Sequence, residues 1–137
     1  MSDDDDPVVR HFLVCRRVKY DPRIPWAPYS VRNVIFNRRP TRGYPVVLPA
    51  VWTFTHIEGT GSHEFWIAVV PYPDDEDDRP EAVASYGPYL VHLGPTPARL
   101  SRGWRLRGVP FPAPGMYSFD FTLGGVVLAQ HFIWLEG

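Results

Sequence analysis

The sequence predicts an all-β fold, a single antiparallel β-sandwich, and three observations support this prediction. Phe, Trp and Tyr make up 15% of the 137 residues, and aromatic side chains favour strands. The 16 prolines favour rigid connections between short elements. About seven or eight stretches of alternating polarity are separated by Gly/Pro turns, a pattern typical of sandwiches and barrels, whereas no ten-residue stretch has a clear helical period.

The chain divides into an acidic tail, residues 1–7, and one domain, residues 8–137. Between residues 8 and 19 the side chains alternate between two faces, which predicts a long first strand. Cys15 lies in this strand among apolar neighbours, so we expect a buried small hydrophobe rather than a reactive thiol. Because it is the single cysteine, no internal disulfide can form.

Residues 21–28 contain three prolines, which exclude regular structure and predict a stiff loop with Trp26 pinned to the body of the domain. Residues 30–36 fit a short strand or a turn, although Ser30 is also a suitable N-cap for a helical turn. A basic loop is predicted next, over residues 37–45. It contains Arg38, Arg39 and Arg42.

The middle of the chain is predicted to form a hairpin, an interrupted strand and a further long strand. Residues 46–58 and 63–70 are its two arms, joined by a Gly-Thr-Gly-Ser turn at residues 59–62. The next strand, over residues 82–93, is broken by Gly87-Pro88, which indicates an edge strand, a bulge or a strand that crosses between sheets. Another turn then leads to a strand over residues 100–109.

The clearest hairpin lies at the end of the chain, after a proline-rich lead-in. From Tyr117 to Leu123 apolar residues alternate with polar ones, which predicts a half-buried antiparallel strand. Gly124-Gly125 permits the positive φ angles of a tight hairpin turn. The return strand, Val126 to Leu135, is apolar or neutral throughout, so we expect it to be packed on both faces.

The pattern P-x-P-G-x-Y-x-F-x-F-x-L-x-G-x-x-L-A, from Pro112 to Ala129, resembles the final hairpin of a family of small uncharacterised bacterial proteins. These proteins are single immunoglobulin-like β-sandwiches. The resemblance covers the arrangement of most of the chain and the motif of its last hairpin. It implies an immunoglobulin-like or related Greek-key sandwich with proline-rich loops, and it brings no catalytic residues.

Charge is separated along the chain, although the net charge is only −1. Two acidic runs, Asp3–Asp6 and Asp74–Asp78, hold nine of the 15 carboxylates. Of the 14 basic residues, 13 are arginine, which suits planar pairing with carboxylates or phosphates. The acidic N-terminus does not fit a secretory signal, and no apolar run is long enough to span a membrane, so we expect a cytoplasmic protein.

Three residues are candidate metal ligands, since imidazole and carboxylate groups bind Zn²⁺: His56, Glu58 and His63. If Glu58 opposes His63 in the predicted hairpin, these side chains converge at one end of the core-facing surface. The alternative is a rim histidine beside a cross-strand polar pair, and on this alternative no metal or other cofactor is expected. The run Asp74–Asp78 lacks the spaced ligands and central glycine of a calcium-binding loop.

Basic segments with interleaved aromatic residues can bind nucleic acid through phosphates and stacked bases. The net charge of −1 argues against this function, because nucleic-acid-binding domains are usually strongly basic. No enzymatic activity is expected, because nothing in the sequence places an exposed nucleophile beside a base. Exposed aromatic rings would offer a platform for a sugar or a peptide.

We therefore expect a non-enzymatic protein-interaction or structural/assembly module with a charged, Arg-rich loop face. It would dock on a protein partner or on copies of itself. The alternative is a ligand-binding β-sandwich, for nucleic acid or carbohydrate. The residues predicted to bind the partner are Trp26, Arg38, Arg39, Arg42, Asp74, Asp75, Asp77 and Asp78.

Overall fold

A computed structural model of the protein describes residues 6–25, 28–72 and 81–137, and confirms the predicted all-β fold. No helix in these residues is long and apolar enough to cross a membrane. Nine strands occur in this part of the chain, more than predicted, because a short strand forms within the predicted loop 37–45. They are β1 (Val8–Tyr20), β2 (Tyr29–Val34), β3 (Asn37–Arg38), β4 (Val46–Gly59), β5 (Ser62–Tyr72), β6 (Ala84–His92), β7 (Ala98–Phe111), β8 (Gly115–Leu123) and β9 (Val126–Leu135).

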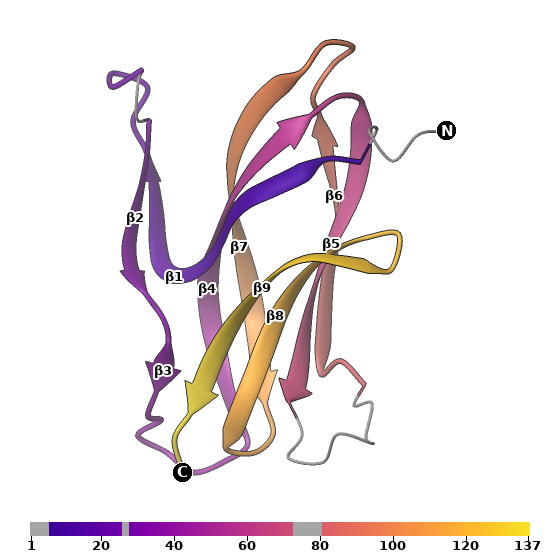
Figure 1. Cartoon of the computed structure of the whole chain (residues 1–137). Helices are drawn as coiled ribbons and strands as arrows, with labels where there is room; N and C mark the ends of the chain where they lie inside the picture. Colours follow the sequence, from indigo (N-terminus) through magenta and orange to yellow (C-terminus); the bar gives the residue numbers. More distant parts are fainter. Residues whose placement is uncertain (1–5, 26–27, 73–80) are drawn as a thin grey trace.

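The strands form two sheets that pack against each other (Figure 1). The four-stranded sheet has the order β2-β1-β4-β7, and the five-stranded sheet has the order β3-β9-β8-β5-β6. Every pairing is antiparallel except that of β3 with β9, which is parallel. The alternative of a helical turn at Ser30 is wrong, because residues 29–34 pair with β1.

The predicted hairpin between residues 46–58 and 63–70 is also wrong, because β4 and β5 belong to different sheets. The connecting segment bonds to the end of β6 instead of closing on itself: Gly61 N–H donates to Gly94 O at 2.7 Å, and Leu93 N–H donates to Gly61 O at 2.8 Å. Turn residues signal a reversal of the chain, but they do not determine which sheet the next strand joins.

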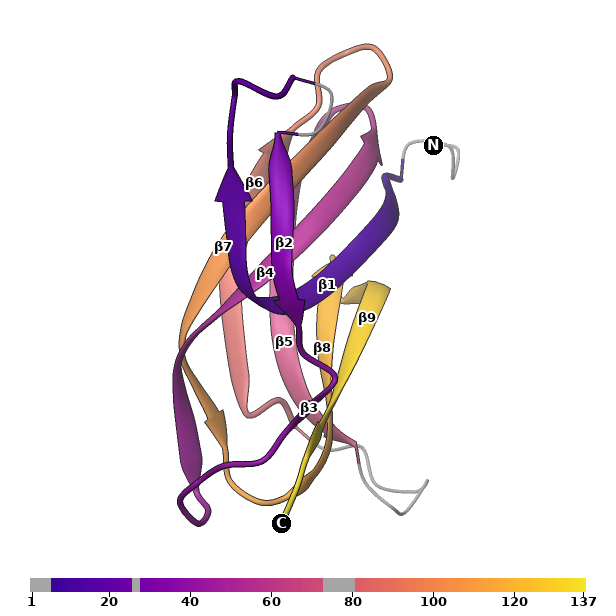
Figure 2. The same ribbon diagram turned by 90° about the vertical axis from the view of Figure 1, so that its left-hand side faces the viewer.

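Strand β1 pairs with two neighbours in succession. Its residues Val8–Cys15 pair with β4, Cys15 also pairs with β2, and Arg17–Tyr20 pair only with β2. The β1–β2 hairpin therefore leaves the sheet as a two-stranded ribbon, at the left of Figure 1 and in front of β4 and β7 in Figure 2. This β1–β2 ribbon lies over the outer face of the four-stranded sheet, where the buried Val18 side chain sits on Gly103 of β7.

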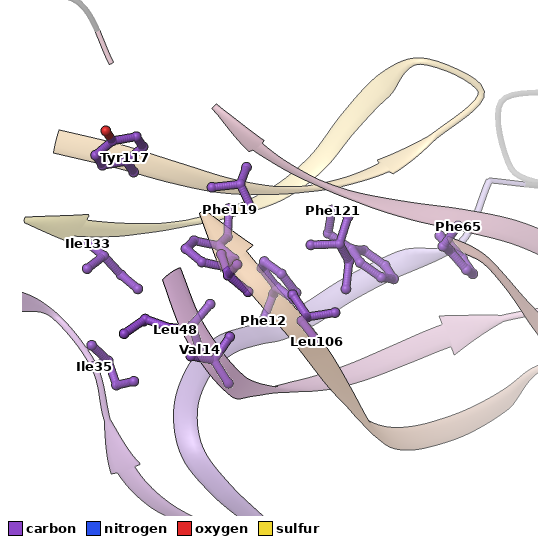
Figure 3. Packing of buried hydrophobic residues seen from close by; sticks show 14 of the residues in the cluster. Phe12, Val14, Ile35, Leu48, Phe65, Leu106, Tyr117, Phe119, Phe121 and Ile133 are labelled. Carbon is purple, nitrogen blue, oxygen red and sulfur yellow. The ribbon is translucent and has the colours of Figure 1, made fainter. Parts of the chain in front are cut away.

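The core lies between the two sheets and is rich in aromatic rings (Figure 3). Phe65 of β5 and Phe121 of β8 stack with ring centroids 4.7 Å apart, and Phe12 of β1 lies 5.2 Å from Phe121 across the sandwich. Strand β7 contributes Leu106, which is fully buried, and Trp104, which packs against this cluster. These contacts join strands from both sheets into one hydrophobic core.

The C-terminal hairpin forms as predicted. Gly124 and Gly125 have φ angles of 58° and 82°, which an L side chain rarely adopts. Only one face of β9 is packed, however, so the prediction that β9 is packed on both faces is wrong. Ile133 is buried in the core, whereas Phe132 and Trp134 remain exposed, because no described element covers the outer face of the five-stranded sheet.

The interrupted strand at Gly87-Pro88 is β6, at the edge of the five-stranded sheet. Its pairing with β5 shifts register next to Gly87. A Cβ at Gly87 would lie 2.9 Å from Phe65 O, so only glycine fits this close approach. The predicted edge strand and irregularity are therefore both present.

Candidate functional site

The predicted partner-binding residues are only partly described by the structure. Trp26, Asp74, Asp75, Asp77 and Asp78 lie outside the described residues. Arg38, Arg39 and Arg42 are exposed on the segment that leads into β4. Arg38 belongs to β3 and pairs with Leu135 of β9, and the Tyr44 hydroxyl donates to Glu136 O at 2.5 Å. These contacts hold the Arg-rich segment beside the end of β9.

Of the three candidate metal ligands, only His56 and Glu58 come together. His63 lies in β5 and its Nε2 bonds to Thr60 O at 2.6 Å, whereas His56 and Glu58 lie in β4. Their expected position in the core is also wrong, because the alternate residues Thr55 and Ile57 fill the core side of β4. Among the described residues, no group of three or more His, Cys, Asp or Glu side chains could hold a metal ion.

Glu58 is instead the centre of an ion-pair network on the outer side of the four-stranded sheet. Its Oε2 accepts a hydrogen bond from Arg10 Nε at 3.0 Å, and its Oε1 lies 3.3 Å from Arg99 Nε and 3.5 Å from His56 Nε2. The hydrogen bond from Arg10 lowers the pKa of the Glu58 carboxyl below its ordinary value. Because β1, β4 and β7 all contribute to this network, it links three strands.

Three aromatic residues form an exposed patch on the outer face of the five-stranded sheet. Tyr72, Met116 and Trp134 occupy one cross-strand row of β5, β8 and β9, and Phe132 lies in the next row. The Tyr72 and Phe132 rings meet edge to face with centroids 5.6 Å apart. Their exposed fractions are 59% for Tyr72, 47% for Trp134 and 39% for Phe132. We call Tyr72, Phe132 and Trp134 the aromatic face.

The aromatic face forms one side of a groove of about 920 Å³. The proline-rich lead-in to β8, Pro112–Pro114, forms another side, and Met116 lies between them. Further along the same outer face, Asp120 accepts hydrogen bonds from Ser118 Oγ and, at 3.1 Å, from Gln130 Nε2. The groove is therefore apolar, and a satisfied polar network borders it.

The second surface feature is a hollow of about 820 Å³ on the β1–β2 ribbon. At the tip of the ribbon Asp21 N–H donates a 2.6 Å hydrogen bond to Pro28 O, and Asp21, Arg23, Ile24 and Pro28 form one wall. Four basic residues line the hollow together with aromatic ones. The lining includes Arg17, Lys19, Arg23, Arg32, Tyr20 and Trp52. We call this site the ribbon hollow.

Cys15 is buried as predicted, with no exposed surface. Burial raises the pKa of its thiol to about 11. A thiol with so high a pKa is almost entirely protonated at neutral pH and is a poor nucleophile. Cys15 is therefore a packing residue.

The aromatic face was not among the sites predicted from the sequence. Its residues lie in β5 and β9. The apolar residues of these strands are nearly continuous in the sequence, and such a run predicts a buried strand. The one available signal was the excess of aromatic residues, 15% of the chain, over what a small core holds. For the ribbon hollow, the sequence shows the basic residues that line it but not that they lie close to one another.

Comparisons with known proteins do not assign the chain to a family: no protein-family model matches it, and a search of curated proteins gives no match.

Proposed function

We propose that the protein is a non-enzymatic interaction module on an immunoglobulin-like scaffold, and that it binds a protein partner through the aromatic face. The observation that carries this proposal is the exposure of Tyr72, Phe132 and Trp134 together in one apolar groove. Large exposed apolar patches on small proteins mark interaction sites. Tyr and Trp are two of the three residue types that dominate binding hot spots, and both occur in this patch.

Two features support the immunoglobulin-like assignment. Apart from β2 and β3, the sheets have the orders β1-β4-β7 and β9-β8-β5-β6, and among these seven strands the chain changes sheet after β4, β6 and β7. Tyr117, at the start of β8, donates its hydroxyl to Ala113 O at 2.6 Å, as in the tyrosine corner of such sandwiches. The fold supplies a scaffold and does not itself specify a function.

The experiment compares proteins that co-purify with the wild-type chain and with two variants expressed in the native host. Tyr72→Ser/Trp134→Ser removes two anchors of the aromatic face. Leu90→Ser is the matched control, since Leu90 is 71% exposed and lies on the other edge of the same sheet. Because all three side chains are exposed, the variants should fold normally, which far-ultraviolet circular dichroism checks.

We expect a partner to co-purify with the wild type and with Leu90→Ser. Hot-spot anchors contribute about 2 kcal/mol or more each, so Tyr72→Ser/Trp134→Ser should weaken binding at least roughly 30-fold. Equal recovery of the partner with this variant would contradict the proposal, as would the absence of any specific partner of the wild type.

A carbohydrate ligand is the second candidate, and the concave shape of the aromatic groove favours it. Sugar rings stack on aromatic side chains through their apolar faces. Trp134 lines the groove, so its fluorescence should respond to a bound glycan. Titration of the wild type with soluble glycans, with Trp134→Ser as the control, distinguishes this function from protein binding.

A further inference from the structure

The ribbon hollow carries an excess of positive charge that the described residues do not neutralise. Asp21 is the one acidic residue in its lining, and both of its carboxylate oxygens bond to Arg23, at 2.9 Å and 3.0 Å. In the part of the chain that the structure describes, no carboxylate forms an ion pair with Arg17, Lys19 or Arg32. Three cations in one hollow are therefore left for an external anion.

The register of the ribbon places two of these cations against each other. Arg17 of β1 is directly opposite Arg32 of β2, and Lys19 is opposite Ser30 in the next pair on the same face. Like charges directly opposite in an antiparallel pair are destabilising. An anion bound between them would remove this repulsion and gain charge-assisted hydrogen bonds from both guanidinium groups.

We propose that the ribbon hollow binds the acidic run Asp74–Asp78 of a second copy of this chain and so joins copies head to tail. The proposal rests on the proposed function, that the protein is an interaction module. It adds the ribbon hollow as a second binding surface, with another copy of the chain as the partner. The run offers five consecutive carboxylates, the counterpart of an arginine-rich hollow. A net charge of −1, with two acidic runs, disfavours a nucleic acid as the anion.

The contact must join different copies, because the run follows the end of β5 and precedes the start of β6, which both lie at the end of the molecule opposite the ribbon tip. Strand β5 ends and β6 begins at the bottom of Figures 1 and 2, whereas the tip of the β1–β2 ribbon is at the top. The segment between Tyr72 and Ala84 can reach out from its two anchors by only about 20 Å. Strand β4 alone, with 14 residues, is about 45 Å long.

Contacts between two different surfaces of the same chain do not close on themselves, unlike the contacts of a twofold dimer. The interaction should therefore produce oligomers whose size grows with concentration and falls with salt, because exposed charges are screened. Light scattering behind a sizing column, at low and at high ionic strength, measures this mass. The monomer mass is 15.7 kDa.

Two variants separate the two halves of the contact. Arg17→Glu/Arg32→Glu reverses the hollow, and a quadruple variant with Asn at positions 74, 75, 77 and 78 neutralises the run. Each alone should stay monomeric at low salt. An equimolar mixture should form a 1:1 heterodimer of twice the monomer mass, because one variant keeps the hollow and the other keeps the run. Arg102→Glu/Arg107→Glu, which changes two exposed arginines of β7 that do not line the hollow, should assemble like the wild type.

An alternative role for the basic residues is to prevent the exposed edge of the ribbon from pairing with strands of other molecules. Charged residues of either sign have this effect. On that role Arg17→Glu/Arg32→Glu would leave the solution mass unchanged. A wild type that is monomeric at low salt would overturn the proposal. So would binding of a single-stranded oligonucleotide that the same double variant abolishes while the mass stays monomeric.

These outcomes are independent of the aromatic face. If Tyr72→Ser/Trp134→Ser loses the co-purifying partner while Arg17→Glu/Arg32→Glu has no effect on mass, the head-to-tail contact is wrong and the proposed function stands. If Arg17→Glu/Arg32→Glu abolishes assembly while Tyr72→Ser/Trp134→Ser still recovers the partner, the aromatic face is not the partner site. The ribbon hollow alone then mediates association.

Discussion

Replacing Gly103 with alanine should destabilise the protein by displacing the β1–β2 ribbon from the sheet. The new Cβ would lie 2.9 Å from Cγ1 of Val18 and 3.2 Å from its Cβ, which is closer than van der Waals contact allows. Val18 is only 9% exposed, and its pairing with Val31 fixes it in the ribbon, so it cannot yield alone. The ribbon also packs on the sheet through Tyr29, whose ring lies 5.9 Å from that of Phe54.

Two opposing contributions determine the size of the effect. Overpacking costs about 1–3 kcal/mol, whereas replacing a glycine inside a strand returns about 0.5–1 kcal/mol of backbone entropy. We therefore expect Gly103→Ala to lower the free energy of unfolding by about 1 kcal/mol. Urea unfolding followed by tryptophan fluorescence measures this change, with the slope of the transition as a check that the compactness of both states is unaltered.

Val18→Ala is the partner substitution that makes the test specific. Alone, it removes two buried methyl groups and should cost about 1.5 kcal/mol. In the double variant the alanine methyl at position 103 fills part of the vacated space, so the combined loss should be about 1 kcal/mol smaller than the sum of the single losses. Additive losses, or a Gly103→Ala protein more stable than the wild type, would refute the packing of Val18 on Gly103.

Three further predictions concern buried polar groups. Tyr117→Phe should lower the free energy of unfolding by about 1–2 kcal/mol, because the hydroxyl donates to Ala113 O at 2.6 Å and accepts from Ala113 N–H at 3.3 Å; an unchanged melting temperature would contradict this. Thr55→Val should raise that free energy by about 1 kcal/mol, because the buried Thr55 Oγ1 has no hydrogen-bond partner among the described residues. Thr53→Val is its control in the same urea assay and should not be stabilising, because Thr53 Oγ1 donates to Trp104 O at 3.2 Å. Burial lowers the pKa of His131 below its ordinary value of 6.5, so the unfolded chain takes up this proton first as the pH falls. Stability should therefore decline as the pH drops through 6.5, and His131→Asn should reduce this decline; equal slopes in both proteins would show that His131 is not responsible.

The strands themselves could be predicted from the sequence because their signal is local. The alternation from Tyr117 to Leu123 and the glycines at 124 and 125 depend only on neighbouring residues, and this hairpin is present as predicted. The partner of β4 is not a local property. The Gly59–Ser62 segment has the composition of a hairpin turn, yet its hydrogen bonds to Leu93 and Gly94 direct β5 into the other sheet.

The aromatic face was missed for a related reason. An uninterrupted apolar strand predicts burial on both faces only if a second layer covers each face of the sheet. The side chains of β9 do not reveal that the five-stranded sheet is covered on one face alone. Phe132 and Trp134 are the residues at which this difference appears, because they alternate with the buried His131 and Ile133.

The ribbon hollow is the clearest example of a feature that depends on strand register and that composition alone does not reveal. From the sequence, Arg17 and Arg32 are two of 13 arginines in separate segments. In the ribbon they are opposite each other, and a slip of one residue would separate this pair by placing Arg32 opposite Arg16 or Val18. The register is fixed by apolar residues on the opposite side of the same ribbon, where Val18 and Val31 pair and Val18 sits on Gly103. The packing that anchors the ribbon therefore also brings its like charges together, and the repulsion between them persists unless an anion lies between them.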